Sequence, residues 1–404
     1  MQYFKDFIVG DLAEAFSGYA FSAKDLVDKG IPVLKIGNIQ RKNVTKTVDT
    51  YYNGEIVGKL EKYILQQNDF LIAMTGAGSV GRVGKMHDNN TTYLVNQRVA
   101  IVRPTKADAN FLYYWFSMPF VEKYLYSLGI GAGQPNISAK DILKLKIKIP
   151  NRNIQTKIAD ILSTYDNLIE INNKRIKLLE KIAENLYKEW FIRFRFPEYE
   201  NAEFENGIPK GWKKNKIESY YTTCSGGTPS RSKPQYYENG IYPWIKTGEI
   251  KDCIIIDAEE YITQEALDNS SAKIIPANSV IMAMYGVNIG SLAYVADKMT
   301  CNQACCVFSD KRIFSSKHYL YNYLKSIREY LLSISFGAAQ QNLSQDLIKN
   351  ITIVMPTDSI VKAFEAYVDS VYNNIKILLQ KNRNLIKQRD LLIPRLMSGK
   401  LEVE

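Results

Sequence analysis

The sequence predicts an α+β protein in which two similar globular domains are separated by two long antiparallel helices that form a coiled coil. Two observations predict this class. The chain repeats itself about halfway along its length, and each repeat ends in a long helical pattern with apolar residues at heptad spacing. Two copies of a domain followed by a helix are most simply arranged about an approximate twofold axis. We therefore expect an internal pseudo-twofold repeat with a globular domain at each end of a helical rod.

The repeat consists of matching segments in the same order along both halves. Residues 131–138 (GAGQPNIS) return as residues 337–344 (GAAQQNLS), and Asn96-Gln97 return at the same offset as Asn302-Gln303. Matches in the same order along half a chain indicate an internal duplication. Further matches at or near this offset are Ile149-Pro150 with Met355-Pro356, residues 73–76 with 283–286, and residues 30–39 with 240–250.

Each repeat begins with about 150 residues of short β-like runs that are punctuated by Gly, Asn and Pro. Asp69–Met74 and Ser279–Met284 are examples of such runs. A mixed globular domain is expected in each case, followed by the long helix. The predicted boundaries are 1–152 for the first domain, 153–193 for the first helix, 194–207 for a linker, 208–358 for the second domain and 359–400 for the second helix.

The two helices carry apolar residues at steps of three and four, with one extra step of four at a matching place in each. They begin just after Pro150 and Pro356. About 37 residues at 1.5 Å each give a rod of roughly 55 Å, which favours pairing of the two helices over packing of each helix on its own domain. The predicted pairing positions are Ile158, Tyr165, Ile169, Asn172, Ile176, Leu179 and Leu186 in the first helix, and Phe364, Val371, Ile375, Leu378, Asn382, Leu385 and Leu392 in the second.

An asparagine falls within the apolar series of each helix. A buried amide at such a position commonly fixes the register of a coiled coil while lowering its stability. The alternative is that Asn172 and Asn382 both face water at the rim of the helix pair.

Composition limits the classes of function. A net charge of +10 with a pI near 9 modestly favours a polyanionic partner. The odd number of cysteines, 5, without a pairing pattern indicates a reducing compartment, so a cytoplasmic protein is expected. Neither an apolar signal core nor a run of roughly 18 apolar residues is present, which argues against secretion and against a membrane span.

The sequence contains no convincing catalytic or metal-binding pattern. Residues 76–81 (GAGSVG) match the GxGxxG dinucleotide motif, but residues 286–290 keep only its outer glycines, so a turn between strands is predicted. No Pro-Pro dipeptide occurs, so the Asn/Asp-Pro-Pro-aromatic motif of amino-methyltransferases is missing. We therefore expect a non-catalytic binding protein without a metal. Spacing predicts buried thiols at Cys301, Cys305 and Cys306 and surface histidines at His87 and His318.

Segments at the ends of both helices resemble conserved regions of type I restriction-modification specificity (S) subunits. They are residues 186–197 (LYKEWFIRFRFP) and residues 389–401 (RDLLIPRLMSGKL). Residues 207–212 (GIPKGW), followed by residues 226–230 (GGTPS), are similar to the usual opening of a target-recognition domain in that family. The first half begins with MQYFK and lacks both opening segments.

The resemblance implies two target-recognition domains that read a bipartite, asymmetric site in double-stranded DNA. It further implies that two modification subunits, which carry S-adenosylmethionine, hold the helices and methylate an adenine in each half-site. Motor-nuclease subunits that use ATP and Mg would join for cleavage, and this chain would bind no cofactor itself. Two alternatives remain: the partner is a single fused methylase-nuclease chain, or the duplicated domains bind protein and the chain is a coiled-coil adaptor.

Candidate DNA-reading residues are polar side chains beside the duplicated turns, because Arg, Lys, Asn and Gln supply most hydrogen bonds to base edges. The alternative is that side chains common to both repeats only support the loops. Arg41-Lys42 have no basic counterpart at Asp252-Cys253, so the two half-sites are expected to differ. The candidates are Lys35, Arg41, Lys42, Arg82, Gln97, Arg98 and Gln134 in the first domain, and Arg231, Lys233, Lys246, Asn288, Gln303 and Gln341 in the second.

Overall fold

The computed structural model describes residues 4–86, 91–130, 134–312, 314, 316–335 and 342–403. The chain divides into two compact units. The first unit comprises Met1–Ile169 and Asn384–Glu404, and the second comprises Glu170–Arg383. Each unit therefore holds one globular domain and one part of each long helix, and the division falls inside both helices.

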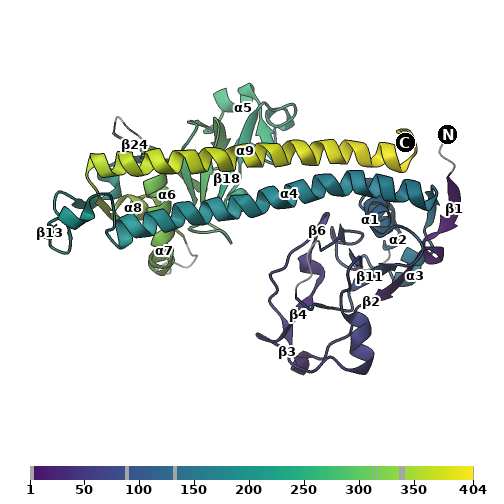
Figure 1. The fold of residues 1–404 in the computed structure, drawn as a ribbon. Coiled ribbons are helices and arrows are strands. Elements are labelled where there is room, and N and C mark those ends of the chain that lie inside the picture. The colour runs from purple at the N-terminus through teal and green to yellow at the C-terminus, as the bar shows by residue number, and fades with distance from the viewer. Residues whose placement is uncertain are drawn as a thin grey trace. The chain divides into compact units, whose positions relative to one another are not determined.

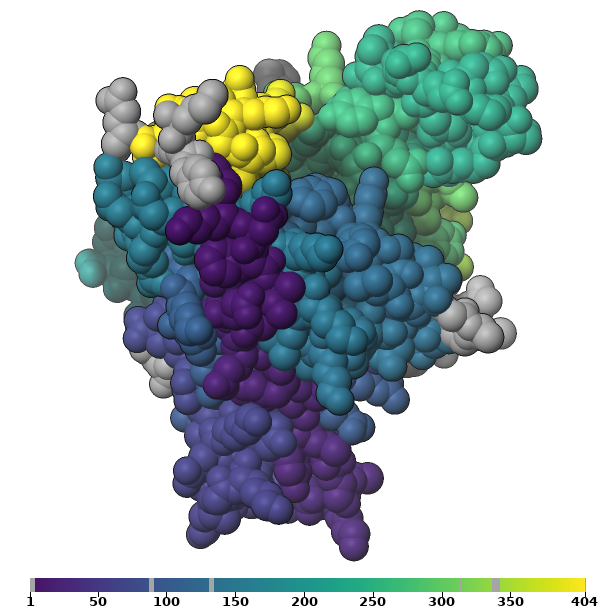
Figure 2. Space-filling view, turned by 90° about the vertical axis from the view of Figure 1, so that its right-hand side faces the viewer, coloured from purple at the N-terminus to yellow at the C-terminus, as the bar shows by residue number. Residues whose placement is uncertain are grey.

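The strands of the first unit form sheets with the orders β2-β11-β8-β9 and β10-β4-β7-β3. In addition, β1 pairs with β12, and β5 pairs with β6. Figure 2 shows the purple N-terminal segment of this unit lying against its blue and teal residues. The strands are β1 Lys5–Ile8, β2 Ala13–Ser17, β3 Leu26–Val27, β4 Ile31–Leu34, β5 Ile39–Gln40, β6 Asn43–Val44, β7 Tyr51–Tyr52, β8 Phe70–Ala73, β9 Val83–Gly84, β10 Leu94–Val95, β11 Val99–Pro104 and β12 Lys146–Ile149.

The strand β8 lies at the centre of the first unit and is buried on both faces. Its alternate residues point to opposite sides, as in any strand. Phe70 and Ile72 belong to the core that includes the helices α1, Ala109–Phe116, and α2, Pro119–Leu128. Leu71 and Ala73 belong to a second core with residues of β4 and β10. Burial on both faces explains why β8 is a continuous apolar run.

The second unit repeats this arrangement. Its sheets have the orders β16-β24-β21-β22-β18 and β19-β17-β23-β20, and β15 pairs with β25. The strands are β13 Phe204–Glu205, β14 Ile208–Pro209, β15 Lys213–Lys216, β16 Tyr221–Ser225, β17 Tyr242–Ile245, β18 Cys253–Ile255, β19 Glu260–Ile262, β20 Ile274–Ile275, β21 Val280–Ala283, β22 Leu292–Val295, β23 Met299–Cys301, β24 Cys305–Asp310 and β25 Thr352–Met355. The shorter helices of the chain besides α1 and α2 are α3 Ala139–Leu143, α5 Gln264–Asp268, α6 Lys317–Ser326, α7 Arg328–Ser335 and α8 Gln345–Lys349.

Strand pairing confirms the internal duplication. The pair of β11 with β8 aligns Val99 with Ala73, and the pair of β24 with β21 aligns Cys305 with Ala283. The parallel pair of β10 with β4 returns as the parallel pair of β23 with β17. β1 in the first repeat and β15 in the second each pair antiparallel with the strand that precedes the long helix. The predicted repeat therefore extends through the whole of each globular domain.

The two long helices are α4, Arg152–Tyr187, and α9, Asp358–Met397 (Figure 1). A π-helical segment, Lys188–Ile192, continues α4. In the first unit, Ile158 shares a core with Leu396, and Asp166 bonds to Arg389. As the residue number rises in one helix it falls in the other, so the pair is antiparallel.

The second unit shows the same direction of pairing. Asn172 contacts Asn382, and the ring of Trp190 packs against that of Phe364. The predicted antiparallel pairing is therefore confirmed within each unit.

All the predicted pairing positions are at least half-buried. Ile158, Asn172, Ile176, Phe364, Ile375 and Asn382 are buried, whereas Tyr165, Ile169, Leu179, Leu186, Val371, Leu378, Leu385 and Leu392 are half-buried.

The two asparagines of the helix pair face each other rather than water. The amide nitrogen of Asn172 donates to the side-chain oxygen of Asn382 at 2.8 Å. The amide of Asn382 donates in turn to the side-chain oxygen of Asn173 at 2.9 Å. These hydrogen bonds satisfy polar groups that would otherwise be buried without partners.

Cys301, Cys305 and Cys306 are buried free thiols, as predicted. The expectation of a surface position for His318 is wrong, because this side chain is fully buried and its ring stacks on Tyr294. His87 lies outside the described residues.

Among the residues that the structure describes, no helix combines the length and the apolar composition that crossing a membrane requires.

Candidate nucleic-acid interface

Three segments meet at one end of β8 in the first unit. The backbone N–H of Met74 donates to the carbonyl of Arg98 at 3.0 Å, and that of Gly76 donates to the carbonyl of Pro135 at 3.2 Å. Residues 75–82, 96–98 and 134–137 are thereby brought together, and we call them the first recognition edge. The candidates Gln97, Arg98 and Gln134 are all exposed on this edge.

The glycine-rich segment of this edge is a turn between antiparallel strands, as predicted. It joins β8 to β9, which pair Leu71 with Gly84. Gly76, Gly78 and Gly81 have φ values of 104°, 73° and 83°, which L side chains rarely adopt. A strand follows the turn, so the segment lacks the helix N-terminus that binds the pyrophosphate of a dinucleotide.

The second unit has an equivalent edge. Met284 N–H donates to the carbonyl of Ala304 at 2.9 Å, which joins the turn between β21 and β22 to the segment before β24. Asn288 Nδ2 donates to the carbonyls of Thr247 and Gly248 at 3.1 and 3.2 Å. Residues 285–291, 302–304, 247–249 and 227–228 form what we call the second recognition edge. The candidates Asn288 and Gln303 lie on this edge, and Gln341 lies outside the described residues.

Thr228 lies on the second edge but is not among the DNA-reading residues predicted from the sequence. Its hydroxyl hydrogen-bonds to the side-chain oxygen of Gln303. The backbone of the preceding residue, Gly227, donates to the carbonyl of Cys301 at 2.9 Å. The GGTPS segment contains Thr228, so the sequence signal was present, although its contact with Gln303 requires the tertiary fold.

Lys35 and Lys246 occupy equivalent positions and are both engaged by carboxylates. Lys35 Nζ lies 3.2 Å from Asp49 Oδ1, and Lys246 Nζ lies 2.8 Å from Glu260 Oε1. The hydrogen bond from Lys246 to Glu260 raises the pKa of this lysine. These contacts favour a loop-supporting role for both lysines over direct reading of bases.

Arg231 and Lys233 also have partners within the second unit. The guanidinium of Arg231 lies 4.2 Å from the ring centroid of Tyr237 and forms an ion pair with Glu260 at 2.6 Å. Lys233 Nζ donates to the hydroxyl of Tyr236 at 3.0 Å. Cation–π contacts of this kind stabilise exposed loops by about 0.5–1 kcal/mol.

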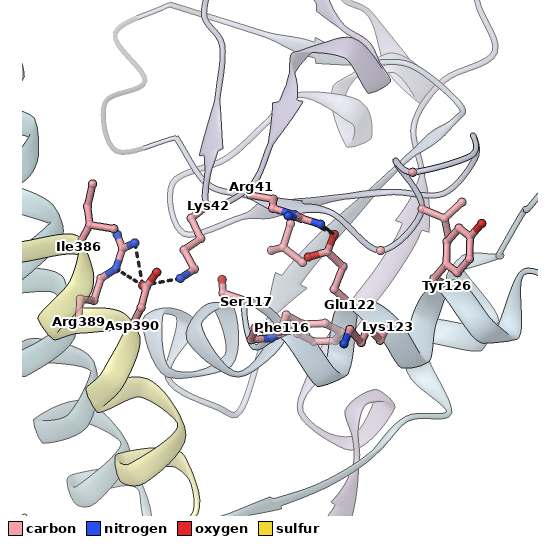
Figure 3. Close-up of a pocket in the computed structure, with 15 residues that line it drawn as sticks. Arg41, Lys42, Phe116, Ser117, Glu122, Lys123, Tyr126, Ile386, Arg389 and Asp390 are labelled. Carbon is pink, nitrogen blue, oxygen red and sulfur yellow. Dashed lines mark hydrogen bonds and ion pairs between the residues drawn. The ribbon is translucent and has the colours of Figure 1, made fainter. Parts of the chain in front are cut away.

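A cleft of about 750 Å³ adjoins the glycine turn of the first unit (Figure 3). Arg41 reaches across it to Glu122 at 3.1 Å, and Lys42 Nζ lies 2.5 Å from Asp390 Oδ1. Burial is the main cause that lowers the pKa of Lys42. Lys42 is thus held against α9, whereas the side chain of Arg41 remains mostly exposed.

Arg82 follows the glycine turn and is half-buried. Its Nε is one of the buried polar atoms without a hydrogen-bond partner in the part of the chain that the structure describes. A buried donor without a partner is unfavourable by about 1–3 kcal/mol. This donor of Arg82 is therefore available to a ligand that reaches it.

The charge pair beside the glycine turn is reversed in the second unit. There the guanidinium of Arg328 binds the carboxylate of Asp252 and also donates its Nε–H to the carbonyl of Gly290 at 3.2 Å. In the first unit the positions of the charges are exchanged: the arginine, Arg41, precedes the turn, and the acidic residue, Glu122, lies on α2. The same place in the two domains therefore carries different chemistry.

A cluster of titratable groups joins α6 to α9 in the second unit. Glu365 accepts the N–H groups of His318 and Tyr319 at 3.0 and 2.9 Å, and His318 Nε2 lies 2.9 Å from Asp369. The ligand atoms of these three acidic and imidazole side chains lie within 4.8 Å of one another, a spacing that could hold a metal ion. Lys317 Nζ already supplies a cation 2.9 Å from Asp369. We therefore regard the cluster as a support for α6.

The stability of the second unit should fall between about pH 6.5 and pH 8. Burial raises the pKa of Glu365 from its ordinary value of 4.5 to about 8, so the folded chain retains a proton that the unfolded chain releases. Burial also lowers the pKa of His318 below 6.5, so this histidine contributes no slope above that pH. Denaturation of the full chain at several pH values measures the slope.

The matched variant for this titration is Glu365→Gln, because glutamine still accepts the two N–H groups but does not titrate. Its unfolding free energy should be flat over the same window. Equal slopes for the variant and the wild type would contradict the assignment to Glu365.

Comparison with known protein families gives a match over most of the chain. The model of the family described as type I restriction modification DNA specificity domain matches residues 1–181 and again residues 209–388. These two ranges coincide with the two halves of the internal duplication.

Curated relatives and a solved structure are similar along most of their length. The MjaIX specificity subunit of a type I restriction enzyme from Methanocaldococcus jannaschii is 28% identical over 342 residues, which cover 82% of this chain and 78% of the relative. The HindI specificity subunit from Haemophilus influenzae is 24% identical over 331 residues, covering 66% of this chain and 71% of the relative. The crystal structure of a type I restriction-modification S subunit from M. genitalium superimposes with a TM-score of 0.59 at 15% sequence identity. The match covers 98% of this chain and 96% of that chain, and it shows that the two have a similar fold.

Proposed function

Because the chain belongs to the family of type I restriction-modification DNA specificity subunits, we propose that it selects the DNA sequence on which such an enzyme acts. Subunits of this class are not catalytic themselves. The proposed ligand is double-stranded DNA with a bipartite, asymmetric site, one half-site for each globular domain. The observation that carries this proposal is the duplicated recognition edge, which is held by matching backbone hydrogen bonds in the two units but carries different side chains.

The two edges have similar backbone hydrogen bonds but different side chains, as expected of two domains that read different DNA sequences. Backbone hydrogen bonds from Met74 and Met284 hold the edges in the same way in both domains. Arg98 of the first edge is replaced by Ala304 in the second. Arginine is the side chain that most often reads guanine in the major groove, whereas alanine cannot donate a hydrogen bond. The two domains should therefore prefer different bases.

The proposed partners are modification subunits that bind the exposed apolar faces of the helices. In the second unit, Ile171, Leu178 and Ile182 of α4 are 47%, 63% and 54% exposed although they are apolar. Their spacing of seven and four places them on one face of the helix. A groove of about 430 Å³ lies beside Leu178 and Ile377. Exposed apolar surfaces of this kind mark sites of protein interaction.

In the first unit, Leu168 of α4 and Leu391 of α9 are also exposed, at 43% and 62%.

We propose that S-adenosylmethionine, ATP and Mg are bound by the partner subunits that methylate and cleave. Extrusion of the target adenine would also occur in the modification subunit.

The selection of DNA is tested by sequencing N6-methyladenine in the host genome with and without this gene. We expect methylation of adenines in one bipartite motif that disappears when the gene is deleted. An unchanged pattern of methylation would reject the proposal. Binding to duplex DNA that depends on neither its sequence nor the salt concentration would instead favour the adaptor function.

The partner surface is tested by the double variant Leu178→Glu with Ile182→Glu. Both side chains are exposed, so the chain should fold normally but lose co-purification with its modification subunit. Lys177→Glu, on another face of the same helix, is the matched control and should retain the partner. Retention of the partner by the double variant would exclude this face as the docking surface.

A further inference from the structure

The turn between β21 and β22 presents an apolar side chain at its tip. Val287 is fully exposed there, and Tyr285 of the same turn is 39% exposed. Gly286 separates them and has a φ of 81°, a backbone conformation that allows the chain to reverse at this point. The side chain of Val287 therefore projects from the second recognition edge without being covered by the rest of its own domain.

The tip is held in place by hydrogen bonds on both sides of Val287. The N–H of Ile289 donates to the carbonyl of Gly286 at 3.1 Å, and the N–H of Ser291 donates to the carbonyl of Asn288 at 2.9 Å. The side chain of Asn288 is itself bonded to two carbonyls of the neighbouring turn. Less conformational freedom is therefore lost when a ligand meets Val287, which favours binding at this position.

The corresponding turn of the first unit, residues 75–81, carries no large apolar side chain at its tip. This turn reads Gly76-Ala77-Gly78, and it is one residue longer between the flanking methionine and the last glycine. The small Ala77 is exposed in the corresponding region. The apolar tip is thus a difference between the domains, and it lies on the edge where Gln303 and Thr228 offer polar groups.

In the major groove, thymine is distinguished by its C5 methyl group, which apolar side chains contact. We propose that Val287 contacts the methyl group of a thymine in the half-site that the second domain reads. This inference rests on the proposed function and deepens it, because it names one base and the group that is recognised. Val287 is then a specificity-determining residue on the same edge as Gln303 and Thr228, whose side chains bond to each other.

The experiment replaces each thymine of the half-site, one at a time, by deoxyuridine, which lacks only the methyl group. The site is first taken from the methylated motif, and binding is measured with the full chain in complex with its modification subunits. We expect one position at which this replacement weakens binding of the wild type by about three- to fivefold, the effect of losing one buried methyl group. Val287→Ala should bind thymine and deoxyuridine almost equally at that position.

Ile241→Ala is the matched control. Like Val287, Ile241 is apolar and exposed, at 66%. It precedes the start of β17, whereas the second recognition edge is bonded to the other end of that strand, through the hydrogen bond from Asn302 N–H to the carbonyl of Ile245. This variant should keep the wild-type response to deoxyuridine at every position. Because Val287 is fully exposed, Val287→Ala should also unfold at the same temperature as the wild type.

The inference is overturned if no thymine shows a methyl effect that depends on residue 287, or if the half-site contains no thymine. It is also overturned if Val287→Ala weakens binding equally for all sequences, because the side chain would then contact only the DNA backbone. In each of these cases the wild type still binds a specific site, so the proposed function stands. Absence of any specific binding would reject the proposed function itself.

Discussion

We expect the replacement of Asp166 by alanine to lower the free energy of unfolding of the first unit by about 3 kcal/mol. Asp166 is buried between the helices, where one oxygen binds the guanidinium of Arg389 and the other accepts the hydroxyl of Tyr114 at 2.6 Å. Without Asp166, the carboxylate that remains beside the buried Arg389 among the described residues is the partly exposed Asp390, at 2.9 Å. Hydrogen exchange measures this loss because it resolves the two units separately.

Two further variants isolate the cause. The double variant Asp166→Leu with Arg389→Met removes both charges and should recover most of the lost stability, since a buried ion pair is often replaced by apolar residues without loss. Lys148→Ala breaks the exposed pair with Asp6, at 3.7 Å, and should change stability by less than about 1 kcal/mol. A double variant as unstable as Asp166→Ala would contradict the explanation by an unpaired charge.

We expect the replacement of Phe364 by alanine to lower the free energy of unfolding of the second unit by about 3–5 kcal/mol. The ring is fully buried, and its centroid lies 4.8 Å from that of Phe191 and 5.8 Å from that of Trp190. Alanine leaves a cavity that these rigid aromatic neighbours cannot fill. Denaturation of the full chain, followed by hydrogen exchange in the second unit, measures the loss.

Tyr367→Ala is the control for this substitution. Tyr367 lies one turn further along α9, is 62% exposed and contacts Trp190 with ring centroids 5.9 Å apart. Its removal should lower stability by less than about 1 kcal/mol, because little surface becomes newly exposed. Similar losses for the two variants would show that Phe364 does not anchor the core.

The aromatic cluster around Phe364 includes residues of two of the segments that carry the family resemblance. Phe191, from the π-helical segment that continues α4, and Phe196, which follows that segment, pack against Trp212 of the GIPKGW segment. These motifs therefore close one core of the second unit by bringing the helix end and the start of the domain together. In this chain their aromatic rings join the end of the long helix to the start of the second globular domain.

The sequence predicted the repeat and the helices because both depend on patterns within the chain itself. Matching segments reveal a duplication directly, and heptad spacing places apolar residues on one face of any helix. The asparagines were recognised as candidates for a buried pair for the same reason. The direction of helix pairing followed from the symmetry of two copies.

The sequence alone did not determine which polar residues have partners within the fold. Lys246 is held by Glu260 from a neighbouring strand, and the buried position of His318 depends on Asp369 of α9. Such contacts join residues that are remote in sequence, and their burial depends on how sheets and helices pack.

The sequence by itself therefore determined the family, the two-domain repeat and the helix pairing. Periodicity and duplication can be recognised by comparing one part of the sequence with another, without knowledge of tertiary contacts. Only the tertiary structure decided that Lys35, Lys42 and Lys246 are engaged by carboxylates while Gln97, Arg98 and Val287 are exposed at the recognition edges. The physical reason is that the environment of a side chain is set by neighbours that only folding brings together.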